Sequence, residues 1–202
     1  MTESEAEIPQ IDIGIGEAHL ARGPAILRTV LGSCVGVTFW SPRLGVGALC
    51  HGVLPSCREL TSAVDGYRFV EFAIRDLARK LDALGIHRSE VQIKVFGGAD
   101  MFPAGALGPP RIAVGDKNWR MAMEVLRDER FIVNACDVGG SAGRVIQLNT
   151  VTGRVHLRRL SPVAKPAACQ AISRKEPLCE SCTFPCSDCR RILNSSQICR
   201  KP

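Results

Sequence analysis

A cysteine and a histidine near the start of the chain have the residue types and the spacing for nucleophilic chemistry. Cys34 follows two small residues, Gly32 and Ser33, and opens an apolar run, and His51 closes the next apolar run. If these runs form adjacent strands joined by the turn at 41–45, the thiol and the imidazole lie side by side. A thiol beside a base is the smallest set of groups that supports acyl transfer through a thioester.

Each of the two residues also has a purely structural interpretation. Free cysteine is among the most buried residue types, and a single histidine after an apolar run is more often a packed core residue than a base. Two features favour chemistry: little side-chain bulk precedes the sulfur of Cys34, and an imidazole near a thiol favours the thiolate. On the residues alone, both interpretations stay open.

Neighbouring residues could complete such a site. The second ring nitrogen of His51 would need a partner, and Thr29, on the strand leading into Cys34, is the nearest candidate. Its structural alternative is a threonine favoured in strands for its β-branching. Ser33, next to Gly32, or the backbone N–H of Cys34 could donate a hydrogen bond to a developing oxyanion, although Gly-Ser is also ordinary turn chemistry.

Hydrophobic periodicity predicts the elements that must position these residues. Asp65 and Asp116 are candidate helix N-caps, and Gly85 fits the position after the last turn of the first helix. The order indicates a mixed α/β or α+β fold rather than an alternating parallel one. We expect strands over 11–22, 25–31, 34–40, 46–53, 91–96, 131–135, 145–149 and 154–157, and helices over 67–84 and 117–127.

Two glycine-rich segments, 96–102 and 137–144, follow predicted strands. Neither matches a phosphate-binding fingerprint, because no helix is expected directly after either one. They could let backbone or substrate approach the site closely, or they could be ordinary loops.

Composition divides the chain into a body, 1–160, and a tail, 161–202, which has no hydrophobic periodicity. Residues 1–159 carry 19 basic and 17 acidic side chains, whereas residues 160–202 carry 7 and 3, so most of the net charge of +6 lies in the tail. A solvated segment accounts for this charge, and we do not predict nucleic-acid binding. No stretch is apolar enough to cross a bilayer and the N-terminus has no secretory signal, so we expect a cytoplasmic protein without membrane insertion.

The tail also holds six of the ten cysteines, four of them in two CxxC pairs. Four thiolates can close a tetrahedral zinc site, but the three-residue spacer between the pairs is shorter than structural zinc sites usually have. A structural zinc and a disordered tail without metal both remain open. The four candidate ligands are Cys179, Cys182, Cys186 and Cys189.

The body resembles the CheD family of chemoreceptor glutamine deamidases over roughly residues 10–160. The resemblance does not extend to the Cys-rich tail. It is carried by segments that occur in the family's order: Gly14-Ile15-Gly16-Glu17, Leu31-Gly32-Ser33-Cys34-Val35, His51 before Leu54-Pro55, Phe96-Gly97-Gly98-Ala99-Asp100-Met101, Gly115 with Asn118, Asp137-x-Gly139-Gly140, and Gly143-Arg144.

This resemblance implies a Cys–His–Thr site with Cys34 as nucleophile and His51 as base. Thr29 corresponds to the threonine, and Arg28 occupies the alternative position for it. The family implies a sandwich of mixed β-sheets with flanking helices, and deamidation of receptor glutamines through a thioester without a cofactor. It also implies two partners, the cytoplasmic domain of methyl-accepting chemoreceptors and, in some bacteria, a CheC-type phosphatase.

Two other functions compete with the enzyme. A non-enzymatic chemotaxis adaptor would bind the receptor or the phosphatase through the same surface without turnover, and a metal-dependent regulator would act through the tail. A depressed pKa of the Cys34 thiol would favour the enzyme. The sequence does not decide whether glutamyl methyl esters are also cleaved, because only the leaving group differs.

Overall fold

The computed structural model describes residues 8–56, 66–100 and 114–160. Within these ranges, strands and helices follow one another in a mixed order. They are β1 (Gln10–Asp12), β2 (Ala18–Arg22), β3 (Ile26–Leu31), β4 (Val35–Ser41), β5 (Val46–Gly52), α2 (Val70–Ala83), the short 3-10 helix η1 (Arg88–Glu90), β6 (Gln92–Gly97), α3 (Val114–Asp128), β7 (Val133–Val138), β8 (Arg144–Asn149) and β9 (Val155–Arg159).

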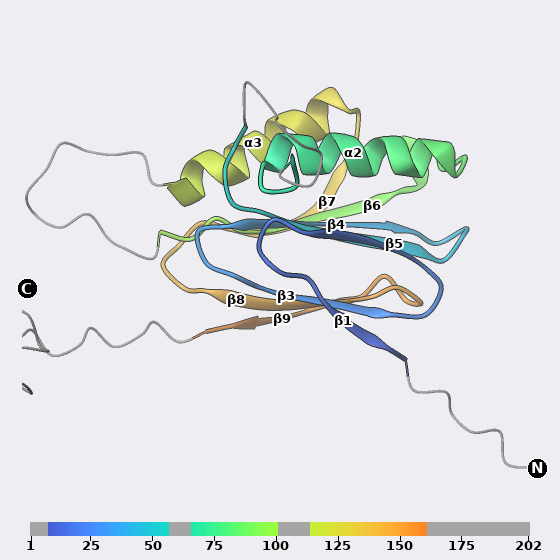
Figure 1. Ribbon diagram of the computed structural model, residues 1–202, viewed down its shortest axis with the longest axis horizontal. Coiled ribbons are helices and arrows are strands. Elements are labelled where there is room, and N and C mark those ends of the chain that lie inside the picture. The colour runs from blue at the N-terminus through green and yellow to red at the C-terminus, as the bar shows by residue number, and fades with distance from the viewer. Residues whose placement is uncertain (1–7, 57–65, 101–113, 161–202) are drawn as a thin grey trace, which may run out of the picture. The chain divides into compact units, whose positions relative to one another are not determined.

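The strands form two sheets. A five-stranded sheet, here called the central sheet, has the order β2-β5-β4-β6-β7, and a four-stranded sheet, here called the outer sheet, has the order β1-β3-β8-β9. Helices α2 and α3 cover one face of the central sheet, and the outer sheet lies on its other side (Figure 1). The prediction of a mixed α/β fold with sheets and flanking helices is confirmed.

The central sheet is buried on both faces, and two apolar clusters show why. The helix-side cluster includes Cys50 of β5 together with Ile74 and Leu77 of α2. The inter-sheet cluster includes Leu49 of β5 together with Leu27 of the outer sheet. Because successive strand residues point to opposite faces, β5 contributes alternately to the two clusters, and His51 therefore shares its face with Leu49.

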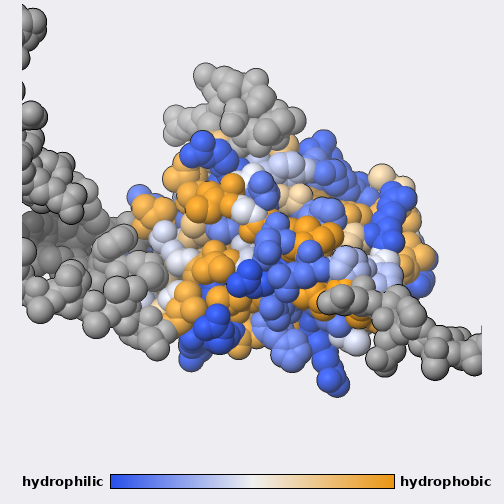
Figure 2. All heavy atoms as spheres, turned by 60° about the horizontal axis from the view of Figure 1, so that its bottom comes forward, coloured by the Kyte–Doolittle hydropathy of each residue, from blue (hydrophilic) through white to orange (hydrophobic). Residues whose placement is uncertain are grey.

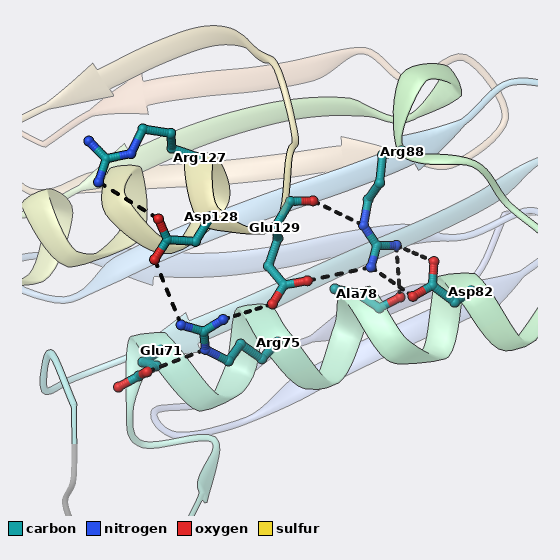
Figure 3. A network of polar contacts seen from close by, with 8 residues as sticks. All are labelled: Glu71, Arg75, Ala78, Asp82, Arg88, Arg127, Asp128 and Glu129. Carbon is teal, nitrogen blue, oxygen red and sulfur yellow. Dashed lines mark hydrogen bonds and ion pairs between the residues drawn. The ribbon is translucent and has the colours of Figure 1, made fainter.

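Ion pairs on the surface join α2 and the 3-10 helix η1 to the C-terminal end of α3 (Figure 3). Arg75 of α2 contacts Glu71 and Glu129, and Arg88 of η1 contacts Asp82 and Glu129. The network fastens the helical layer at one edge. Such exposed pairs contribute little individually, about 0–1 kcal/mol each, so the apolar clusters dominate the packing.

The predicted strand at 11–22 is wrong, because the segment forms two strands in different sheets. β1 pairs with β3 and β2 pairs with β5. Between them, Glu17 closes a turn by accepting the backbone N–H of Gly14 at 2.7 Å on its carboxylate. The turn moves the chain from the outer sheet to the central sheet, which an alternating pattern cannot reveal.

Helix ends and one strand also differ from expectation. The helix α3 begins at Val114, so Asp116 is not its N-cap but lies in the first turn, where it accepts hydrogen bonds from Trp119 and Arg120. β7 begins at Val133 and extends to Val138, later than predicted. Gly85 follows α2 with a φ of 67°, as the C′ position requires. Asp65 lies outside the described residues.

The outward face of the outer sheet mixes charged and apolar side chains, as Figure 2 shows with this side of the molecule turned forward. Val30 and His156 are exposed there, and Arg28 pairs with Asp12. No helix among the described residues is long and apolar enough to span a membrane. The tail and its four candidate zinc ligands lie outside the described residues.

Candidate active site

The strand register places Cys34 and His51 on the same side of the central sheet. His51 of β5 pairs with Gly36 of β4, and Cys34 lies two residues before Gly36, so it is diagonally across from His51. Cys34 packs against the inter-sheet cluster, the side that His51 also faces. The thiol is partly exposed, whereas His51 is buried.

Gly36, which pairs with His51, faces the inter-sheet cluster. A Cβ at this position would lie 2.9 Å from Cδ1 of Leu31 and 3.4 Å from Cδ1 of Ile146. The absence of a side chain on Gly36 therefore lets Leu31 of the outer sheet pack closely against β4.

Thr29 fixes the tautomer of His51. The hydroxyl of Thr29 donates to the carbonyl of Ile13 at 2.7 Å, and its oxygen lies 2.8 Å from Nδ1 of His51. Since a hydroxyl has only one proton to donate, Thr29 must accept from Nδ1–H. The neutral imidazole therefore has an unprotonated Nε2, and this buried atom has no hydrogen-bond partner among the described residues.

The turn between β1 and β2 holds the backbone of His51. Gly16 donates its N–H to the His51 carbonyl at 2.9 Å, and the His51 N–H donates to the Glu17 carbonyl at 2.9 Å. The same turn follows Ile13, which anchors Thr29. One local structure thus positions both the histidine and its threonine partner.

Burial shifts the acid–base properties of both reactive groups toward their neutral forms. It lowers the pKa of His51 below its ordinary value, against the opposing effects of the Ile13 carbonyl and the Glu17 carboxylate. It raises the pKa of the Cys34 thiol, with a smaller opposing effect from the backbone. A depressed pKa of the Cys34 thiol, the sign that would favour the enzyme, is not found in the free protein, because desolvation disfavours the thiolate. The resting groups are a thiol and a neutral imidazole that face the same side of the central sheet.

The first glycine-rich segment holds the backbone of the cysteine loop. Gly98 donates its N–H to the Cys34 carbonyl at 2.7 Å, and Ala99 donates to the Gly32 carbonyl at 2.9 Å. Gly97 must be glycine here: its φ is 101°, and a Cβ would lie 2.2 Å from the Cys34 carbonyl oxygen. The described part of this segment, 96–100, thus makes a close backbone contact with the loop that carries the nucleophile.

The second glycine-rich segment supports the first. Gly139 donates its N–H to the Gly97 carbonyl at 2.9 Å. The segment is closed on itself by the buried guanidinium of Arg144, which donates to the Asp137 carboxylate at 2.7 Å and to the carbonyls of Gly139 and Ala142. Burial opposes ionisation of Asp137, but Arg144 and Arg159 outweigh it and lower the pKa of this carboxyl.

One buried residue near the site was not expected from its residue type. Asn118 of α3 donates from Nδ2 to the Ser33 carbonyl at 3.0 Å and to the Val53 carbonyl at 2.8 Å. The only sequence signal was its position in the family resemblance, since a polar residue on a predicted helix is usually read as solvent-facing. Its spacing from Ala122 and Gly115, both buried, places it on the inward face of α3.

Two other cysteines lie in the part of the chain that the structure describes. Cys136 is exposed on β7, and Cys50 is buried on the helix side, where desolvation raises its pKa to about 12. Within the described ranges, no group of three or more metal-ligating side chains comes together.

Fold and site together define a class of two-sheet α/β protein in which a cysteine and a threonine-bound histidine share one face of a sheet. The chain matches the family model described as CheD chemotactic sensory transduction over residues 53–159, more than half its length. The chain belongs to the CheD family. The matched residues begin after His51, so this match is independent of the two reactive side chains.

Curated relatives cover nearly all of the body. A protein of Geobacter sulfurreducens named probable chemoreceptor glutamine deamidase CheD 2 is 37% identical over 80% of this chain and 96% of its own length. Proteins named probable chemoreceptor glutamine deamidase CheD are 32% identical in Maridesulfovibrio salexigens, over 79% of this chain and 97% of the relative, and 31% identical in Pyrococcus horikoshii, over 75% and 93%.

Proposed function

We propose that this chain is a protein-glutamine deamidase that converts glutamine side chains of chemoreceptors to glutamate through a thioester on Cys34. The observation that carries the proposal is the hydrogen bond between Nδ1 of His51 and the Thr29 hydroxyl, which itself donates to the Ile13 carbonyl. We infer from it that Nδ1 carries the proton and that Nε2, which has no hydrogen-bond partner among the described residues, can take one. The names of the relatives support the same activity and substrate class.

In the first half of the proposed reaction, the sulfur of Cys34 attacks the carboxamide carbon of a receptor glutamine. Because the resting thiol is protonated, its proton passes to Nε2 of His51 as the carbon–sulfur bond forms. The carbonyl oxygen becomes an oxyanion, which the backbone N–H of Cys34 or the Ser33 side chain stabilises. The imidazolium then returns the proton to the leaving nitrogen, and ammonia departs.

In the second half, water attacks the thioester carbon. His51, again neutral, takes a proton from the water through Nε2, and the tetrahedral intermediate collapses with release of the sulfur, which recovers the proton. The products are a glutamate side chain and the free thiol of Cys34. The balance is glutamine plus water giving glutamate plus ammonium, since the carboxylic acid formed passes its proton to the released ammonia, so the proposed cycle uses protein groups and water alone.

The proposed substrate sets the proposed partners and location. A receptor cytoplasmic domain would present its glutamine at the partly exposed thiol, and the action would take place in the cytoplasm. A CheC-type phosphatase is a second proposed partner. A structural zinc on the four tail cysteines is a separate proposal, which metal analysis of the full chain and of a chain without residues 161–202 would test.

The decisive experiment follows one receptor glutamine by mass spectrometry. We expect the wild-type protein to convert glutamine to glutamate in a purified receptor cytoplasmic fragment, with release of ammonia. Cys34→Ala and His51→Ala should abolish conversion, whereas Cys136→Ala, which removes an exposed thiol on β7, should not. Full activity in Cys34→Ala would refute the proposal. Stable receptor binding by the wild-type protein without conversion would favour the adaptor instead.

A further inference from the structure

Asn118 joins the two segments that carry the reactive side chains. Ser33, whose carbonyl it binds, immediately precedes Cys34, and Val53, whose carbonyl it also binds, lies two residues after His51. Asn118 itself is fully buried and comes from α3, which belongs to neither segment.

The chemistry of the side-chain amide fits this arrangement. An asparagine Nδ2 has two hydrogens to donate, and the two carbonyls use both. Ser33 and Val53 are partly buried, so without Asn118 their carbonyl oxygens would lose a donor at a site where water reaches them only in part. No other residue of similar size offers two neutral donors on one atom.

We propose that Asn118 is a positioning residue that fixes the cysteine loop relative to the end of β5, and thereby sets the approach of Cys34 to His51. The backbone pairing of β4 with β5 ends at Val35 and Gly52, so it does not hold Ser33 and Cys34. On the other side, Gly98 and Ala99 bind the carbonyls of Cys34 and Gly32. Asn118 connects the cysteine loop to the end of β5, through its hydrogen bonds to the carbonyls of Ser33 and Val53.

The packing at the start of α3 supports this role. Gly115, one turn before Asn118, lies against the backbone of the first glycine-rich segment: a Cβ on Gly115 would be 2.6 Å from the carbonyl oxygens of Gly98 and Ala99. α3 can therefore approach close enough for a side chain as short as asparagine to reach both carbonyls. The proposal rests on the proposed function, because positioning has meaning only if the thiol reacts.

The test compares Asn118→Leu, which is close in size but has no donor, with Thr150→Val. Thr150 is a matched control: it is also fully buried and its hydroxyl bridges two backbone groups, those of Ala25 and Gly23, but it does not contact the site. For deamidation of a receptor fragment by folded protein, we expect Asn118→Leu to lower kcat by about 10²-fold, the effect of a misplacement of about 1 Å. KM should stay within about twofold, since the residue does not touch substrate.

A second readout needs no substrate. Alkylation of Cys34 by iodoacetamide should become faster in Asn118→Leu, with its pH midpoint moving down, because a released loop is more hydrated. Alkylation of the exposed Cys136 should not change. Thr150→Val should lower thermal stability while leaving kcat and Cys34 alkylation at wild-type values. If the wild-type protein proves not to be a deamidase, the alkylation comparison still decides whether Asn118 holds the loop.

Wild-type kcat and wild-type Cys34 alkylation in folded Asn118→Leu would overturn the proposal, as would a change in KM alone. If the variant does not fold, NMR of the wild-type protein decides. Slow solvent exchange of both Asn118 side-chain amide protons supports the bridge, and exchange at the rate of an unfolded chain excludes it.

Discussion

At the scale of single residues, the site depends on the one proton of the Thr29 hydroxyl. That proton goes to Ile13, which forces Nδ1 of His51 to be the donor and Nε2 to be the base. The Ile13 carbonyl, a backbone group, is the fixed end of this series of two hydrogen bonds. The position of the proton on the neutral imidazole is therefore set by the backbone at the turn between β1 and β2 rather than by another titrating group.

Thr29→Val should separate this effect from packing, because valine has nearly the same shape without the hydroxyl. We expect a loss of about 1–3 kcal/mol in the free energy of unfolding, since the buried Nδ1–H and the Ile13 carbonyl lose their partner. Deamidation should fall by about 10²-fold as the imidazole loses its orientation. Thr29→Ser keeps the hydroxyl and should retain most activity. Equal kcat values for the valine and serine variants would contradict the role of the Thr29 hydroxyl in orienting His51.

The buried His51 should also make stability depend on pH. Its pKa is lowered in the folded protein from an ordinary value of 6.5, so below pH 6.5 the unfolded chain binds the proton more readily than the folded one. The stabilisation is fully present above this pH and is lost as the pH falls toward the folded-state pKa. Urea unfolding at several pH values should show this loss in the wild-type protein and a weaker loss in His51→Gln. His156→Gln, which replaces an exposed histidine, should show the same loss of stability at low pH as the wild type. If the free energy of unfolding of His51→Gln falls with pH as steeply as that of the wild type, the prediction is wrong.

At the scale of elements, the site is built where backbone segments approach too closely for side chains. The clearest case is Gly97, where both φ and the contact with the Cys34 carbonyl exclude a Cβ. The first glycine-rich segment therefore acts on the nucleophile through the backbone, which explains why it need not contain any reactive side chain.

Gly97→Ala and Gly45→Ala form a matched pair for this contact. Gly45 also has a positive φ, 59°, but nothing lies within 4 Å of a Cβ there, so its replacement should cost only the backbone strain, about 1–2 kcal/mol. Gly97→Ala carries a clash in addition and should be less stable, with Cys34 displaced and deamidation reduced. Urea unfolding and kcat check both variants. Equal stability and equal activity of the two would show that the contact does not matter.

Elements with strong local patterns could be predicted from the sequence. Two apolar runs joined by a turn that contains Pro42 and Gly45 predict the β4–β5 hairpin. Apolar residues spaced three to four apart predict α2. The turn at 13–17 could not be predicted, because it is fixed by hydrogen bonds to His51 of a distant strand. The direction of the thiol pKa cannot be predicted from the sequence for a similar reason: burial of Cys34 depends on the outer sheet, which its neighbours in sequence do not reveal.

Three of the candidate site residues, by contrast, can be identified by residue type and by family resemblance. Cys34 and His51 are conspicuous because few residue types do nucleophilic chemistry, and Thr29 because its hydroxyl lies on the strand that leads into Cys34. Asn118 did not stand out, since its function depends on both of its donors meeting carbonyls from segments more than sixty residues earlier in the chain. Contacts between residues so far apart in the chain leave no pattern in the sequence from which they could be predicted.

At the scale of the whole molecule, an ion-pair cluster ties the two sheets together at the end where the site lies. Asp137 belongs to β7 of the central sheet, and its two partners, Arg144 of β8 and Arg159 of β9, belong to the outer sheet. Arg144 also closes the second glycine-rich segment, which supports the first through Gly139. Sheet association and site geometry are therefore linked through one carboxylate.

The two arginines should contribute very differently to stability, although both lie within 2.7 Å of the same carboxylate. The side chain of Arg144 is 4% exposed and that of Arg159 is 64% exposed. Arg144→Met should cost about 3–5 kcal/mol, because removing one partner of a buried pair leaves the other charge without compensation. The remaining Arg159 and the partial exposure of Asp137 favour the lower end of this range.

Arg159→Met should cost about 0–1 kcal/mol, the usual contribution of an exposed ion pair. Urea unfolding of the two variants at neutral pH measures the difference, and raising the salt concentration should weaken only the small Arg159 effect, since exposed charges are screened more than buried ones. Combining Arg144→Met with Asp137→Asn should recover part of the loss, because the unpaired carboxylate is removed as well. Similar losses for the two single variants would mean that the cluster acts as ordinary surface charge, and that the sheets are held at this end by the inter-sheet cluster alone.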